Sequence, residues 1–393
     1  MGKTDHDAVL QARVLLLGSG LPSVGEQVSA YRVLLGVNRQ AYAPKLVDAL
    51  LTMAGRSRNP EVGLALTTEA VQVARTIEAG APSRTERLCR ALGSHQAALF
   101  ALGRRAEGRA VRGELAEARG GVRSATVLAE EGRFGEAAEL NEEARSDSLE
   151  DSFGNLVEWA ANLEGAGRHD EASAVFRTFL DTIRRFVTER RVDRDELVWA
   201  LVHHARMRET AGDGAGAAAA RREALTVLEE LAAGGPKGPG RISSWLTLFV
   251  LSGRAGEPAA SADSPMPPFG TATGTGTGTG WSGDVREAFL GGLPGLEAEA
   301  AGLREAGRLP ELVDVRRRIT VRLAVRGGDH PYLFTERYAS CFDEGVALAR
   351  RLSGDPGRLA RALTDRAMFR TAAGDFGPAY ADFAEAVALL DAR

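Results

Sequence analysis

A glycine followed by arginine or aspartate recurs along this chain, each time with similar neighbours. Residues 128–138, Leu-Ala-Glu-Glu-Gly-Arg-Phe-Gly-Glu-Ala-Ala, match residues 163–173, Leu-Glu-Gly-Ala-Gly-Arg-His-Asp-Glu-Ala-Ser. Residues 205–213 match residues 367–375 in the same way. The repeated glycines are Gly103, Gly132, Gly167, Gly212, Gly253, Gly307 and Gly374, with Gly253 in a degraded copy. Such a chain is expected to stack similar units rather than wrap one central core.

The residues at fixed distances from these glycines predict two antiparallel helices joined by a tight turn. The glycine ends the first helix, because that position needs a positive φ that glycine adopts without a Cβ clash. A large apolar residue lies four positions before it, a small residue seven before, an apolar anchor eleven before, and another small residue five after. In that order these are Leu99, Leu128, Leu163, Phe249 and Leu303; Ala125, Ala160, Ala205, Ala300 and Ala367; Leu92, Leu156, Leu201, Leu296 and Leu363; and Ala137, Ala172, Ala217 and Ala379.

Most of the chain reads as helical, because apolar residues recur at spacings of three and four and β-branched alternation is scarce. The helix pair resembles the tetratricopeptide (TPR) repeat, and its spacing resembles the actinobacterial and kinesin-light-chain-like variants. Successive glycines lie from 29 residues (Gly103 to Gly132) to 67 residues (Gly307 to Gly374) apart, whereas the usual repeat has about 34. The resemblance implies an all-α protein, a right-handed α-solenoid of stacked antiparallel helix pairs, and a role in protein interaction.

Two segments interrupt the helical pattern. Residues 234–240 contain six glycines and prolines in close succession and must form a loop. Residues 257–283 are rich in proline, glycine and threonine and include a Thr-Gly alternation, so they predict a flexible linker. The expected organisation is an N-terminal repeat array over residues 1–256, the linker at 257–283, and C-terminal repeats over 284–393.

Charge and cysteine content exclude several classes of protein. With 49 Lys+Arg and 53 Asp+Glu, the net charge of −4 does not favour a nucleic-acid partner. Two cysteines, Cys89 and Cys341, cannot build a disulfide framework or a four-ligand zinc site. No apolar run reaches the length of a secretory signal core or a membrane span. We therefore expect a cytoplasmic protein without a membrane partner.

The motifs that carry chemistry are absent or incomplete. Residues 20–27, Gly-Leu-Pro-Ser-Val-Gly-Glu-Gln, have the spacing of a phosphate-binding loop, but Glu26 and Gln27 replace its lysine and hydroxyl residue. No His-x-x-x-His or Cys-x-x-Cys pair places two metal ligands on one helix face. No Gly-x-Ser-x-Gly elbow is found. We expect no enzyme activity, no cofactor and no metal.

Histidine and tryptophan positions are interpreted from their distance to the turn glycines. His204 falls on the packing side of its helix, whereas His203 faces the groove and is a candidate for partner contact. Trp159 and Trp245 fall at helix-contact positions and are expected in the core. Trp281 follows the Thr-Gly tract and is expected as an exposed anchor or a docking residue.

In a helix-pair solenoid the first helices of successive units line the concave face. Groove-facing positions on those helices lie thirteen, ten, nine, six and three residues before the turn glycine. Candidate partner-binding residues at these positions are Arg90, Arg119, Arg123, His203, Arg206, Glu209, Arg304, Arg361 and Asp365. Several arginines in one groove suit an acidic or carboxylate-bearing segment. The alternative is that these arginines are simply solvated.

The leading hypothesis is a non-enzymatic scaffold or regulator that binds a protein or peptide partner in the groove. A second hypothesis is a ligand- or peptide-responsive sensor that controls a transcription factor or effector enzyme in trans. A third is an enzyme whose site lies on an unrecognised fold. A stoichiometric protein partner would favour the scaffold, and a co-purifying small molecule would favour the sensor.

Overall fold

The computed structural model describes residues 6–118, 125–143, 153–235, 242–270, 281–327 and 334–392, apart from single residues at 19, 21, 58, 82 and 353. All regular elements in these ranges are helices, which confirms the all-α fold class. The chain divides into two compact units, Met1–Arg123 and Ser124–Arg393. This division differs from the one expected from the sequence, because the segment 257–283 lies inside the second unit and not between the two.

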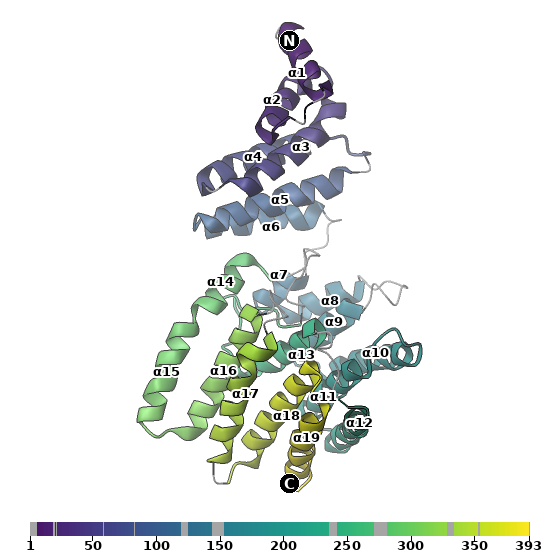
Figure 1. Cartoon of the computed structure of the whole chain (residues 1–393), viewed down its shortest axis with the longest axis vertical. Helices are drawn as coiled ribbons and strands as arrows, with labels where there is room; N and C mark the ends of the chain where they lie inside the picture. Colours follow the sequence, from purple (N-terminus) through teal and green to yellow (C-terminus); the bar gives the residue numbers. More distant parts are fainter. Residues whose placement is uncertain are drawn as a thin grey trace. The chain divides into compact units, whose positions relative to one another are not determined.

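The first unit is a run of helices in which each packs on the next (Figure 1). Its core is built from apolar residues of the middle helices, among them Leu46, Leu50, Ala70 and Leu92. Short side-chain caps set the starts: the Ser23 hydroxyl accepts from the Glu26 backbone N–H, and Asn59 caps the helix that opens with Pro60. The elements are α1 (His6–Leu17), α2 (Val24–Leu35), α3 (Arg39–Arg56), α4 (Pro60–Arg75), α5 (Arg84–Ala101) and α6 (Arg105–Ala118).

The second unit holds the remaining helices and the largest hydrophobic core. Its elements are α7 (Ala125–Glu130), α8 (Phe134–Glu143), α9 (Phe153–Gly165), α10 (His169–Thr188), α11 (Arg194–Thr210), α12 (Gly214–Ala233), α13 (Ile242–Gly253), the 3₁₀ turn η1 (Arg254–Gly256), α14 (Gly283–Gly291), α15 (Leu293–Glu305), α16 (Leu309–Gly327), α17 (Phe334–Arg350), α18 (Pro356–Ala373) and α19 (Phe376–Asp391). Among the described residues, no helix combines the length and apolar character needed to cross a lipid bilayer.

The turn predicted from the sequence is found in both units, and the predicted seam is found in the second. Six of the repeated glycines have φ between +69° and +82°: Gly103, Gly132, Gly167, Gly212, Gly307 and Gly374. The alanines five residues after the turns are fully buried, namely Ala137, Ala172, Ala217 and Ala379. The second helix therefore packs directly against the first at each of these positions, and the antiparallel helix pairs are confirmed.

The degraded copy at Gly253 does not form the same turn. Gly253 has φ −79°, and the chain continues into η1 instead of reversing. The reason that this position is glycine is packing: a Cβ atom there would lie 2.9 Å from both methyl groups of Val321 on α16. Gly253 therefore permits a close approach between α13 and α16.

Helices far apart in the sequence close the second unit on itself. α19 packs against α12, while α13 packs against α11, α16 and α18. In Figure 1, the C-terminal helices α18 and α19 lie beside α11 to α13. The repeats of this unit thus surround a shared interior.

The segment expected to be a flexible linker has buried side chains among its described residues. Phe269 is 2% exposed and Trp281 is 8% exposed. Their rings lie 6.0 Å apart between centroids, and both contact Phe289 of α14. Residues 267–270 are thus packed rather than free, whereas residues 258, 259 and 261–264 are exposed. Trp281, expected as an exposed anchor, is buried, and residues 271–280 lie outside the described ranges.

Candidate functional site

A pocket of about 730 Å³ lies in the interior of the second unit. It is bounded by α11, α12, α13 with η1, α16, α18 and α19. The groove-facing positions of two repeat units meet there. α11 contributes Trp199, Val202, His203, Arg206 and Glu209, and α18 contributes Arg361, Thr364, Asp365 and Met368. Because the C-terminal helices fold back on α11 to α13, the concave faces of two distant repeats become two walls of one site.

The part of the pocket between these walls is apolar. Trp245 and Phe249 of α13 stack with centroids 5.2 Å apart and planes tilted by only 9°. Val321 of α16 and Phe383 of α19 complete this surface. A ligand held here would place an apolar group against the aromatic rings and its polar groups against the side walls.

His203 is a neutral hydrogen-bonding group in the α11 wall. Arg206 Nη2 lies 3.1 Å from His203 Nε2, and since a guanidinium can only donate, Nε2 accepts and the ring proton is on Nδ1. Burial, followed by the charges of Arg206 and Arg254, lowers the pKa of His203 well below its ordinary value. His203 is 4% exposed. It therefore does not provide a positive charge near neutral pH.

Arg206 is held in place by a shared carboxylate. Glu164 of α9 accepts from Arg206 Nη2 at 3.1 Å and from Arg254 Nη2 at 2.9 Å. Arg254 also donates to the Ala161 carbonyl at 2.6 Å. One buried carboxylate thus positions a pocket arginine and fixes η1 against α9.

Arg221 of α12 adds a second buried cation beside the α11 wall. Its guanidinium pairs with Glu209, and its Nη2 lies 3.4 Å from the Asp391 carboxylate of α19. Its side chain is 9% exposed. The ion pairs connect α11, α12 and α19, and they set the position of Glu209 at the pocket.

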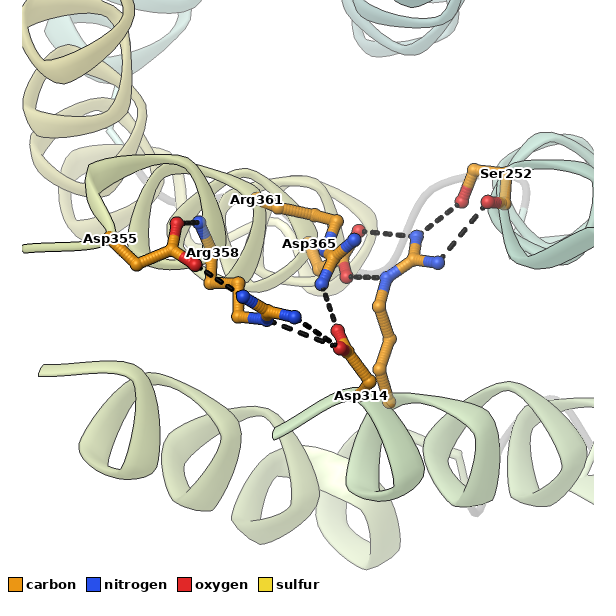
Figure 2. Close-up of polar contacts among 7 residues, drawn as sticks. Ser252, Asp314, Asp355, Arg358, Arg361 and Asp365 are labelled. Atoms are coloured by element: carbon orange, nitrogen blue, oxygen red, sulfur yellow. Dashed lines mark hydrogen bonds and ion pairs between the residues drawn. The ribbon is translucent and has the colours of Figure 1, made fainter. Parts of the chain in front are cut away.

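The opposite wall contains a chain of alternating arginines and aspartates, drawn in Figure 2. Arg317 of α16 bonds Asp365 through Nε at 2.7 Å and Nη2 at 3.2 Å. The same guanidinium donates to the Ser252 carbonyl at 3.2 Å and to the Ser252 hydroxyl at 2.8 Å. Arg317 therefore ties α13, α16 and α18 together with all of its terminal nitrogens engaged.

Asp314 is shared by two arginines of α18. Figure 2 shows Arg358 and Arg361 both turned toward its carboxylate, at 2.7 Å and 2.5 Å. Burial opposes ionisation, but the bonds and charges of these two arginines outweigh it, so the pKa of Asp314 is lowered. Arg358 has a second carboxylate partner in Asp355, and Arg361 is the more exposed of the two, with 44% of its side chain accessible. Arg361 is thus the arginine of this wall best placed to exchange partners.

The structure brings together five of the nine residues predicted for partner binding. His203, Arg206, Glu209, Arg361 and Asp365 all line the pocket.

The other four do not join them. Arg90 pairs with Asp48 in the first unit at 3.2 Å. Arg304 pairs with Glu344 of α17 at 3.0 Å, away from the pocket. Arg119 and Arg123 lie outside the described residues.

Sequence reasoning missed the cations that enter from second helices. Arg221, Arg317 and Arg318 line the pocket although they lie on α12 and α16, which groove positions counted on first helices do not include. A signal was present in the sequence, because residues 316–318 form a run of three arginines. The groove arginines are also not simply solvated, since Arg206 and Arg361 each bond a carboxylate.

The described residues contain no group of three or more histidine, cysteine, aspartate or glutamate side chains placed to hold a metal ion. Cys89 and Cys341 are free thiols. Burial raises the pKa of Cys341, which makes this thiol less reactive.

Comparison with known proteins adds one structural likeness. No protein-family model and no curated protein matches the chain. Among solved structures, the chain is similar to the crystal structure of BtubC (BKLC) from P. vanneervenii, with 13% sequence identity over 86% of this chain and 92% of that chain. The TM-score is 0.20, and a likeness at this level carries no argument. The assignment to a helical-repeat fold rests on the turns and seams described above.

Proposed function

We propose that this chain is a non-enzymatic interaction protein of the TPR-like kind that binds a short partner segment in the pocket of its second unit. The observation that carries the proposal is the meeting of two groove faces, from α11 and α18, at one pocket. First-helix groove faces are where helical-repeat proteins bind extended partners. The resemblance of the turn and seam pattern to the TPR repeat supports the same role.

The charges around the pocket favour a partner segment with a carboxylate next to an apolar side chain. Its lining includes five arginines and three carboxylates: Arg206, Arg221, Arg317, Arg318 and Arg361 against Glu209, Asp314 and Asp365. The lining therefore has two more positive than negative charges. An incoming carboxylate takes over one arginine from its internal partner, and Arg361 is suited to this because Arg358 remains on Asp314. The aromatic surface of Trp245 and Phe249 receives the apolar side chain.

Selection from a random peptide display library against the full chain tests this proposal. Selected peptides should share an Asp or Glu, or a free C-terminus, close to a large apolar residue. Replacing Arg361 by Gln should weaken their binding about tenfold, which corresponds to the loss of one charged hydrogen-bond pair. Arg304→Gln is the matched control, since this arginine is also on a first helix and also paired, but lies outside the pocket. Equal effects of the two substitutions would contradict the proposed site.

The size of the pocket also suits a small-molecule ligand, which supports a second candidate function. About 730 Å³ lies within the range of roughly 300–1,000 Å³ for small-molecule pockets. A small anionic ligand bound there would contact α11, α13, α16 and α18 together and would bias how the unit closes. The protein would then be a ligand-responsive sensor acting on a partner in trans. Thermal shifts with a panel of small carboxylic acids, in the absence of any selected peptide, would favour this function.

A further inference from the structure

A second groove in the second unit is covered by a segment of the chain itself. Counted back from Gly167, the groove-facing positions of α9 include Val157, Glu158 and Ala161. Gly270 lies directly over them: a Cβ atom on Gly270 would overlap the Ala161 Cβ and would lie 3.4 Å from the Glu158 Cα and 3.5 Å from the Val157 carbonyl oxygen. The face that a partner segment would occupy on this repeat is therefore filled by residues that precede the Thr-Gly tract.

The covering segment contacts the repeat at three points along its course. Met266 donates its backbone N–H to the carbonyl oxygen of Glu130, at the end of α7, over 2.9 Å. Further back, the Ala260 carbonyl lies so close to the turn at Gly132 that a Cβ atom on Gly132 would overlap it. The segment thus contacts the turn after α7, the end of α7 and the groove face of α9 in order. The segment thus runs from one helix pair to the first helix of the next, and the concave face of a repeat array binds its partners across successive units.

Phe269 shows that the segment is held by its surroundings and not by its own preference. Its φ is +56°, a region that bulky residues seldom occupy. The ring is 2% exposed and meets Trp281 and Phe289 edge to face at 6.0 Å and 5.8 Å between centroids. Such a conformation persists only where docking compensates for it.

The chain on each side of the segment is fixed by a bond to a charged side chain. Glu257 accepts from Arg322 at 2.6 Å and from Arg318 at 3.2 Å, both on α16. Beyond the tract, Ser282 donates its backbone N–H to the Glu130 carboxylate at 2.7 Å. The segment is therefore a tethered ligand between two anchors, and the tether keeps its local concentration high.

We propose that the groove over α7 and α9 is a second binding site, specific for a Pro-Pro-aromatic-Gly segment. Residues 264–270 occupy it as a tethered ligand, and a partner segment of the same chemistry can replace them. Pro265, Pro267 and Pro268 fix φ at three of its residues, so less conformational entropy is lost at those positions when it docks. Glycine at the last position is required by the contact with Ala161. This site is separate from the pocket, and its existence does not depend on what the pocket binds.

A fluorescent synthetic peptide with the sequence of residues 260–270, Ala-Ser-Ala-Asp-Ser-Pro-Met-Pro-Pro-Phe-Gly, tests the site on the full chain. The unaltered chain should bind it weakly, because the tethered copy competes. Gly270→Ala forces the tethered segment off Ala161, and the variant should bind the peptide at least tenfold more tightly. Adding Ala161→Gly to Gly270→Ala removes the clash, so the double variant should return to weak binding. Gly345→Ala, where an added Cβ meets no atom within 4 Å, is the control and should behave like the unaltered chain.

A second variant releases the segment without adding bulk to the groove. Met266→Pro removes the N–H that bonds Glu130 and should also increase peptide binding at least tenfold. Circular dichroism and cooperative melting establish that each variant is folded. The proposal is wrong if neither folded variant binds the peptide more tightly than the unaltered chain, or if all variants bind it equally. If both variants unfold, the segment is an integral part of the core and not a replaceable ligand, and the proposal is overturned in that case too.

Discussion

Two buried histidines of α11 make the stability of the second unit depend on pH. His204 is buried, stacks on Phe176 and lies with Nε2 3.3 Å from the Ser173 hydroxyl. Burial, with the nearby charges of Arg208 and Arg177, lowers its pKa from 6.5 to about 4. His203, beside it, is also neutral. Two adjacent histidines of one helix are therefore uncharged in the folded protein at pH 6, while the unfolded chain has begun to take up protons.

This difference predicts an acid-sensitive stability. Because both folded-state pKa values are lowered, the unfolded state binds protons first, so the free energy of unfolding is greatest above pH 6.5 and falls as the pH drops toward 4. His204 alone contributes on the order of 3 kcal/mol over that range. Urea unfolding at pH 7.5 and pH 5 measures the change, and His204→Phe should reduce it. A free energy of unfolding that stays level down to pH 5 in the unaltered chain would contradict the burial of these rings as neutral groups.

Glu164 is the residue whose loss should disturb the pocket most. Its side chain is 7% exposed and is bonded by Arg206 and Arg254. Glu164→Gln leaves two arginines without their common carboxylate and should cost about 3–5 kcal/mol, the usual effect of breaking a buried ion pair from one side. Glu171→Gln is the control, since the Glu171–Arg168 pair is exposed to solvent and its loss should change stability little. Chemical denaturation of both variants measures the difference, and equal losses would show that Glu164 is not a buried anchor.

At the scale of the helix pair, the turn glycines and the seam alanines were predictable because their signal is local. The distance from glycine to each contact residue is fixed by helix geometry, so the spacing in the sequence is the spacing in space. Gly253 shows the limit of this reasoning. The degraded local pattern sets it apart from the turn glycines, but its packing role depends on Val321, which lies far away in the sequence.

The helix-pair turn gives a direct prediction from backbone conformation. Gly212 has φ +82° with open space around an added Cβ, whereas Gly214, two residues later, has similar space and no positive φ. Gly212→Ala should therefore destabilise the chain by about 1–2 kcal/mol, while Gly214→Ala should be neutral or stabilise it by up to about 1 kcal/mol. Thermal melts of the two variants make the comparison. Equal melting temperatures would mean that the first helix does not end in the left-handed turn.

At the scale of the whole molecule, the sequence could not indicate which helices and segments far apart along the chain contact one another. α19 on α12 and residues 257–270 on α7 and α9 are long-range contacts, and low hydrophobicity made the second of these look like a linker. The carboxylate partners of the groove arginines likewise come from other helices, as Asp314 does for Arg361. Positions on the groove were predictable from the helix period, but their electrostatic environment was not.

The division into two units predicts independent folding. Residues 1–123 and 124–393 each have their own internal contacts and core clusters. Fragments with these boundaries should each give a helical circular dichroism spectrum and a cooperative melting transition. Loss of cooperative melting in either fragment would show that the unit needs the rest of the chain.

Hydrogen–deuterium exchange on the full chain, with and without a peptide selected as described above, tests most directly whether two repeat faces form one binding site. Backbone amides become protected where binding suppresses local opening. We predict that α11 and α18 gain protection together, although more than 140 residues separate Thr210 from Pro356. Protection confined to residues 1–123, or to α14 and α15, would contradict the account.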